Sequence, residues 1–132
     1  MRTVLVSLLI VFMILAMSCG KDEVGPVISG DTTHPTFASI QTTVFTPSCA
    51  TSSCHGGRER PTLSDGAAYN NIVNISSSQN VLYIVPGDPD ASYLYRKLIG
   101  SSISGGIMPV GLSMPKTKID SIRVWIELGA RR

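Results

Sequence analysis

The sequence is poor in charged residues, aromatic residues and histidine. Asp, Glu, Lys and Arg make up 15% of its 132 residues, aromatic residues make up 6%, and there are 2 histidines. The formal net charge is +2, and no run of basic residues is present. Proteins that bind nucleic acid usually carry a basic patch or stripe, so nucleic acid is not an expected partner.

Patterns typical of hydrolases and β-sheet proteins are also missing. There is no Ser-His-Asp order, no phosphate-binding glycine loop and no pair of carboxylates at metal-binding spacing, and Asp88 and Asp90 suit a turn and a helix cap. Only Val81 to Val85 has the pattern of a short extended run, and no Asn-Gly hairpin is flanked by alternating hydrophobic residues. We therefore expect an all-α domain that is not an enzyme.

The amino-terminal segment has the form of an export signal. Arg2 precedes an apolar run of 14 residues from Val4 to Met17, which is short for a membrane span, and small Ser18 comes just before Cys19. The end of this run resembles a bacterial lipobox, which implies cleavage before Cys19 and lipidation of that cysteine. We predict that residues 1–18 are a lipoprotein signal peptide. The mature protein would be exported to the periplasm or cell surface and anchored to a bacterial membrane by its amino-terminal lipid.

The rest of the chain divides into a linker and one domain. Residues 19–34 mix Gly, Pro, Asp and Ser without apolar periodicity, as a lipidated tether would. Residues 35–132 are enough for one small domain with a modest core, to which a bound cofactor could contribute.

Apolar spacing predicts four short helices in this domain. The first should run from near Pro35 to Phe45, with Thr33 as its cap, and end at Pro47. The second should begin at Ser64–Gly66. The third should be capped by Asp90 and closed by Gly100, and the last should begin with a capping box of Thr117 and Asp120 and stop at Gly129. The residues expected on the buried faces are Phe37, Ile40, Val44, Tyr69, Ile72, Val73, Ala91, Leu94, Tyr95, Leu98, Ile119, Ile122, Trp125 and Ile126.

The segment from Cys49 to Gly57 holds two thiols and an imidazole, and three interpretations compete. Cys49 and Cys54 could form thioethers to a haem, with the adjacent His55 ligating its iron, although four residues rather than the common two separate the cysteines. They could instead form a disulfide, as paired thiols often do outside the cytoplasm. A zinc site with His55 and His34 is the third interpretation, but adjacent Cys54 and His55 cannot easily occupy two corners of one tetrahedron, and no second cysteine pair exists.

Met108 is the candidate for a second iron ligand. It follows Gly105 and Gly106, which allow the backbone to approach a macrocycle closely, and it precedes Pro109, which stiffens the loop. A thioether ligand would raise the reduction potential of the haem. Met114 precedes a proline in the same way and is the alternative, and Met108 could also be a simple core residue.

From about Phe37 to Ala130 the chain resembles class I cytochrome c domains, most closely the variant found in planctomycete and Bacteroidetes surface proteins. The matching pieces are the helix leading to Pro47, Cys54–Gly56, Val85–Pro89 running into Ser92–Tyr95, Met108-Pro109, and Trp125 to Ala130. The resemblance implies about four helices around one covalently attached haem c. It implies that Cys49 and Cys54 attach the haem, that His55 and Met108 ligate its iron, and that the first and last helices pack together.

The function implied by this resemblance is electron transfer to redox partner proteins. Tyrosines could donate hydrogen bonds to the haem propionates and basic residues could neutralise them, the candidates being Tyr69, Tyr93, Tyr95, Arg58, Arg60 and Lys97. Two other functions remain open: a haem-based sensor, which would require Met108 to leave the iron, and a haem-free lipoprotein binding module closed by a disulfide.

Overall fold

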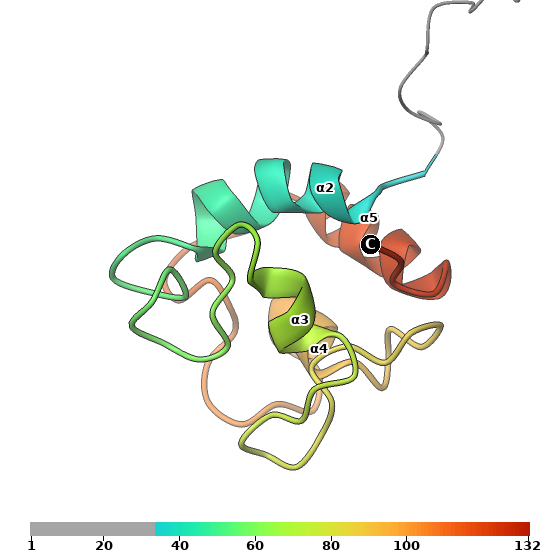
Figure 1. Ribbon diagram of the computed structural model, residues 1–132. Coiled ribbons are helices and arrows are strands. Elements are labelled where there is room, and N and C mark those ends of the chain that lie inside the picture. The colour runs from blue at the N-terminus through green and yellow to red at the C-terminus, as the bar shows by residue number, and fades with distance from the viewer. Residues whose placement is uncertain (1–33) are drawn as a thin grey trace, which may run out of the picture. The chain divides into compact units, whose positions relative to one another are not determined.

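The computed structural model describes residues 34–132, and this part of the chain is helical (Figure 1). Its elements in chain order are α2 (Phe37–Ile40), η1 (Gln41–Cys49), α3 (Ala68–Ile72), α4 (Tyr93–Ile99) and α5 (Lys116–Glu127). Extended segments make only isolated bridges, such as Val73 with Ile84, and residues 34–132 form no sheet. The all-α prediction is therefore confirmed for the described residues. The signal peptide predicted at 1–18, the predicted lipidation of Cys19 and the tether up to residue 33 lie outside them.

The first helical segment begins at Thr36 rather than at the predicted cap, Thr33. The Thr36 hydroxyl accepts a hydrogen bond from the Ser39 amide at 3.2 Å, and the Thr36 amide donates to the Ser39 hydroxyl at 3.1 Å. This reciprocal pair is a capping box in which serine takes the place of the usual glutamate. Phe37, Ile40 and Val44 are buried as their spacing predicted.

The predicted end of this helix at Pro47 is wrong, because the helix continues to Cys49 as the π-helix η1. Proline has no amide proton and disrupts an ordinary α-helical turn. The chain instead adopts wider turns, and the Ala50 amide donates to the Phe45 carbonyl, five residues back, at 2.7 Å. Cys49 consequently lies in the last helical turn and not in a free loop.

A buried serine organises the turn before α4. Ser92 is fully buried; its hydroxyl donates to the Asp88 carbonyl at 2.7 Å and accepts from the Val85 amide at 2.9 Å. The helix begins at Tyr93, so the prediction that Asp90 caps it is wrong; Asp88 is the carboxylate that binds a nearby amide, that of Ala91. The predicted close at Gly100 is confirmed, since this residue is the left-handed cap with φ 75°.

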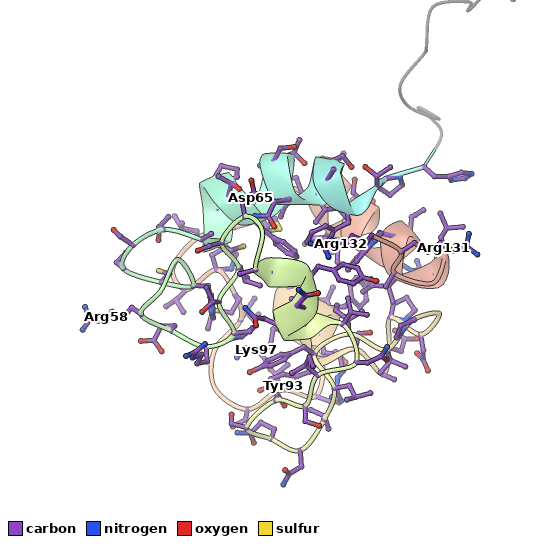
Figure 2. All side chains as sticks on the ribbon, viewed as in Figure 1. Arg58, Asp65, Tyr93, Lys97, Arg131 and Arg132 are labelled. Atoms are coloured by element: carbon purple, nitrogen blue, oxygen red, sulfur yellow. The ribbon has the colours of Figure 1, made fainter. Side chains whose placement is uncertain are left out.

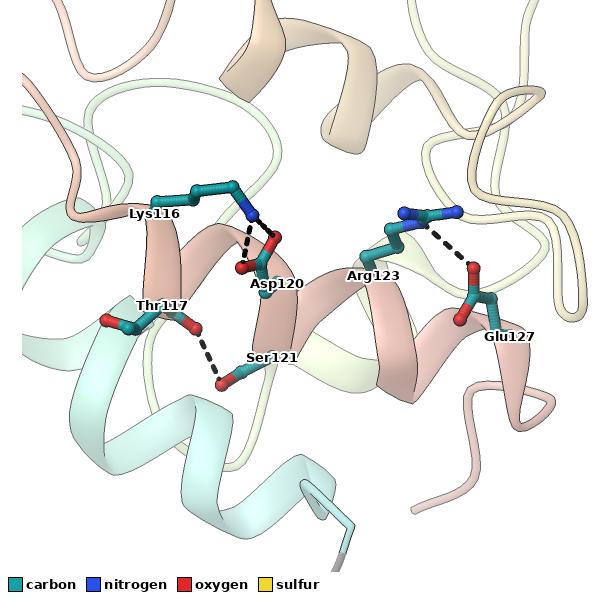
Figure 3. A network of polar contacts seen from close by, with 6 residues as sticks. All are labelled: Lys116, Thr117, Asp120, Ser121, Arg123 and Glu127. Atoms are coloured by element: carbon teal, nitrogen blue, oxygen red, sulfur yellow. Dashed lines mark hydrogen bonds and ion pairs between the residues drawn. The ribbon is translucent and has the colours of Figure 1, made fainter.

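The start of α5 also differs from the prediction (Figure 3). The helix follows Pro115, and no side chain caps it. Asp120 pairs with Lys116 at 2.7 Å and Ser121 donates to the Thr117 carbonyl, so Thr117 and Asp120 form no capping box. The second predicted helix is also shorter than expected, because α3 starts at Ala68 and not at Ser64–Gly66.

The core includes the crossing of α2 with α5 and extends to buried residues of η1, α3 and α4 (Figure 1). The rings of Phe37 and Trp125 have centroids 5.6 Å apart, and Ile122 and Ile126 are completely buried. Packing of the first helix against the last one is therefore observed, and it leaves the inner side of this layer facing α4 and the loops. No helix within residues 34–132 has the length and apolar character that crossing a membrane requires.

Candidate functional site

A pocket opens between the end of η1, the loop after it, α4 and the long connection from α4 to α5. Its cavity measures about 150 Å³ and is open on one side. Most of its wall is apolar, formed by Phe45, Leu63, Leu94, Leu98 and Ile122. The potential ligands that line it are Cys49, His55 and Met108, which come from three segments. The pocket thus combines an apolar wall with one thiol, one imidazole and one thioether.

His55 is held in a single orientation by the backbone that follows it. Its Nδ1 lies 2.9 Å from the carbonyl oxygen of Pro61, and its own carbonyl accepts from the Leu63 amide at 2.7 Å. A carbonyl can only accept, so Nδ1 is the donor in this bond, and in the neutral ring the lone pair then lies on Nε2. Metal-binding histidines are commonly oriented by this kind of bond to a backbone carbonyl. The bond to Pro61 therefore fixes the His55 ring through Nδ1 and leaves Nε2 as the other ring nitrogen at the pocket.

The two candidate methionines are placed differently. Met108 lines the pocket, and its amide donates to the Lys97 carbonyl in α4 at 2.9 Å. Met114 is also partly buried and packs against the core, but it is not part of the pocket lining. Met108 therefore lines the same pocket as His55, and Met114 does not.

The two cysteines of the motif also have different environments. Both are free thiols, with no bond between them. Burial, and secondarily the neighbouring Cys54, raises the pKa of Cys49 to about 11, with a partial offset from Lys118. Hydrogen bonds from Thr51 and then Ser53 lower the pKa of the Cys54 thiol, which is fully exposed and does not line the pocket. The structure does not bring Cys54 into the site with Cys49.

Some of the polar residues proposed to surround a cofactor do reach the pocket. Arg60, Tyr93 and Lys97 contribute to its lining. Tyr69 instead donates to the Ala130 carbonyl at 3.1 Å, Tyr95 lies in the core, and Arg58 projects to the outside (Figure 2). Of these three, the Lys97 ammonium and the Tyr93 hydroxyl already donate to carbonyls of the connection between α4 and α5.

Sequence reasoning missed several contributors to the site. Pro61, which orients His55, and Tyr83 and Ser78, which line the pocket, have no motif of their own. Burial, together with Tyr93, raises the pKa of the Tyr83 hydroxyl, so this group remains a hydrogen-bond donor at neutral pH. Their positions depend on how irregular loops fold, and a loop leaves no periodic pattern in the sequence from which its fold could be predicted. Proline six residues after a candidate histidine ligand was the available signal for Pro61.

A zinc site receives no support from the donor geometry. His34 lies at the exposed start of the described chain and is not part of the pocket. Over residues 34–132 no group of three or more His, Cys, Asp or Glu side chains gathers that could hold a metal ion.

Comparison with protein-family models, with curated proteins and with solved structures found no match to this chain.

The two thiols should react at very different rates in the folded protein. A thiolate is the reactive form, so at about pH 8 a pKa of about 11 instead of 9.0 makes the reactive fraction of Cys49 about a hundredfold smaller. In a Cys19→Ser chain isolated with free thiols, iodoacetamide should modify Cys54 first and Cys49 far more slowly. Peptide mass spectrometry would follow both sites. Unfolding in urea should make the rates similar, and equal rates in the folded protein would contradict the buried placement of Cys49.

Proposed function

We propose that this protein is a mono-haem c-type cytochrome of the class I kind that carries single electrons. The observation that supports this best is the orientation of His55: Pro61 binds its Nδ1 at 2.9 Å, which leaves Nε2 for a metal in a pocket that Met108 also lines. The proposal includes export, attachment to a bacterial membrane through lipid on Cys19, and exchange of electrons with redox partner proteins.

The residues present fit a haem in their donor chemistry. Imidazole and thioether are the His/Met pair that low-spin cytochromes c use, and the apolar wall would keep water from the iron. Two adjustments are required. Cofactor sites typically measure about 300–1,000 Å³, so the loops carrying His55 and Met108 must separate to admit a haem to a cavity of about 150 Å³. Cys54 must also turn inward from its exposed position.

The proposed roles follow from these positions. His55 Nε2 and the Met108 sulfur would hold both axial positions, so no substrate could reach the iron and the protein would be a carrier, not an enzyme. The Cys49 and Cys54 thiols would add across two vinyl groups of the macrocycle, each forming one thioether. Arg60 would face the acidic edge of the cofactor. When bound, haem supplies the one-electron couple.

Expression of the full chain in a bacterium with a c-type maturation system tests this proposal. We expect the intact mass after denaturation to include one haem, and the reduced protein to show sharp visible bands. The double variant Cys49→Ala/Cys54→Ala should lose the mass that survives denaturation. Cys19→Ser is the matched control, which should keep the haem and leave the membrane fraction. A colourless protein lighter by two hydrogens would establish a disulfide instead and overturn the proposal.

A further inference from the structure

One lysine makes three contacts with the loop that carries Met108. Lys97 Nζ donates to the carbonyl of Ser104 at 3.0 Å and to that of Gly106, and the Lys97 carbonyl accepts from the Met108 amide at 2.9 Å. The Lys97 side chain therefore reaches from α4 to the middle of the loop, and the Lys97 backbone carbonyl holds the end of the loop at Met108.

The loop has few other attachments between these points. Backbone amides of residues 102–107 donate to no other backbone group within residues 34–132. The Tyr93 hydroxyl donates to the Ser104 carbonyl at 3.4 Å, a longer distance than that from Lys97 Nζ. Tyr93 lies beside Lys97 on α4 (Figure 2). Ile107 rests against Gly100, where a Cβ would come within 2.7 Å of its side chain. Most of the loop's polar attachment thus depends on one ammonium group.

An ammonium group suits this task for a physical reason. It carries three donors and no acceptor, so it can bind two carbonyl oxygens at once without a competing group of its own. Hydrogen bonds from a charged donor are shorter and stronger than those between neutral groups. Gly105 lies between the two residues whose carbonyls are bound and has φ 74°, a left-handed conformation that glycine adopts without strain.

We infer that Lys97 is a positioning residue that holds the 101–108 loop against α4 and thereby keeps the Met108 thioether at the pocket. The expected effect on the iron rests on the proposed haem function. The attachment of the loop to α4 does not, because all of its contacts are made within the protein. Without Lys97, Met108 would spend more time away from the pocket, and an added ligand could compete for its position.

Hydrogen exchange tests the attachment of the 101–108 loop to α4 without any cofactor. In the haem-free full chain, Lys97→Met keeps the length and apolar stem of the side chain and removes its three donors. The Met108 amide, which donates to the Lys97 carbonyl, should exchange about tenfold faster, as expected for the loss of the charge-assisted bonds that hold the same loop. Lys97→Arg should restore slow exchange. Lys116→Met, which removes an exposed ion pair on α5, is the matched control and should change nothing in this loop. Unchanged exchange in Lys97→Met would overturn the inference.

Ligand competition tests the consequence at the iron. In the haem-loaded full chain, ferric Lys97→Met should bind imidazole about tenfold more tightly than the parent, because the fraction with Met108 released rises. The thioether-to-ferric absorption band should weaken, and Lys97→Arg should restore it. Faster exchange with an unchanged band and unchanged imidazole affinity would overturn the positioning role. If Lys97→Met yields no haem protein, Lys97→Gln, which retains a neutral donor, should give intermediate values, and parental values would overturn the inference. A parent chain that takes up no haem would overturn the proposed function, whereas exchange would still decide whether Lys97 holds the loop.

Discussion

Replacing Trp125 with alanine should lower the free energy of unfolding by about 3–5 kcal/mol, enough to leave a small domain largely unfolded. Trp125 is 2% exposed and packs against Phe37 at a ring-centroid distance of 5.6 Å. Its indole nitrogen donates to the Arg131 carbonyl at 2.7 Å. Alanine would leave a cavity at the crossing of α2 and α5 and an unpaired carbonyl near the chain end. The midpoint of urea unfolding would measure the loss, provided that the slope is unchanged.

Two further substitutions separate packing from polarity at this position. Trp125→Phe keeps an aromatic ring and removes the hydrogen bond with part of the buried ring volume, so it should cost a fraction of the alanine effect. Leu128→Ala provides a control near the same helix, because Leu128 is 47% exposed and should change stability by no more than about 0.5 kcal/mol. Equal midpoints for Trp125→Ala and Leu128→Ala would contradict the burial of the indole.

Helix positions were predictable because the buried face of a helix places apolar residues three or four positions apart in the sequence. Phe37, Ile40 and Val44, and then Ile122, Trp125 and Ile126, recur at helical spacing and are buried in the structure. Gly100 and Gly129 also marked helix ends correctly, since both have positive φ values of 75° and 92°. These signals are local, so the fold class could be predicted without knowing any tertiary contact.

Helix starts were not predictable with the same success, because a polar side chain has several available partners. Asp120 looked like part of a capping box, but its carboxylate binds Lys116 one turn earlier. Ser92 is the residue before α4, yet its hydroxyl turns inward to Val85 and Asp88. Pro47 suggested a stop, whereas a π-helical segment accommodates it. The choice among such partners is made by tertiary packing.

Two residues that line the pocket could be predicted from the sequence, and most of their surroundings could not. His55 and Met108 stood out by their neighbours in the sequence, and both line the pocket. Pro61 and Lys97, which hold them, lie in segments with no such motif. Cys54 was grouped with Cys49 by adjacency to His55, but the four intervening residues form a turn that leaves its thiol in solvent. Spacing along a chain does not report which way a side chain turns.

Replacing Met108 with alanine in the haem-loaded protein should lower the reduction potential by a sizeable part of the about 0.8 V that axial ligands span. A thioether favours the ferrous state, and the water or weaker ligand that replaces it does not. The thioether-to-ferric band should disappear, and the ferrous iron should gain an open position for carbon monoxide. Redox titration and visible spectra would measure both changes on one sample.

Met114→Ala is the matched control for this change. Met114 packs against the core outside the pocket, so its removal should reduce stability modestly and leave the potential and the band as they are. If Met114→Ala lost the band and Met108→Ala kept it, Met114 would be the second axial ligand. The connection between α4 and α5 would then have to rearrange. A parent protein that already binds carbon monoxide readily would indicate that Met108 does not hold the iron firmly. That behaviour belongs to a haem-based sensor, because a carrier needs both axial positions filled while the electron moves.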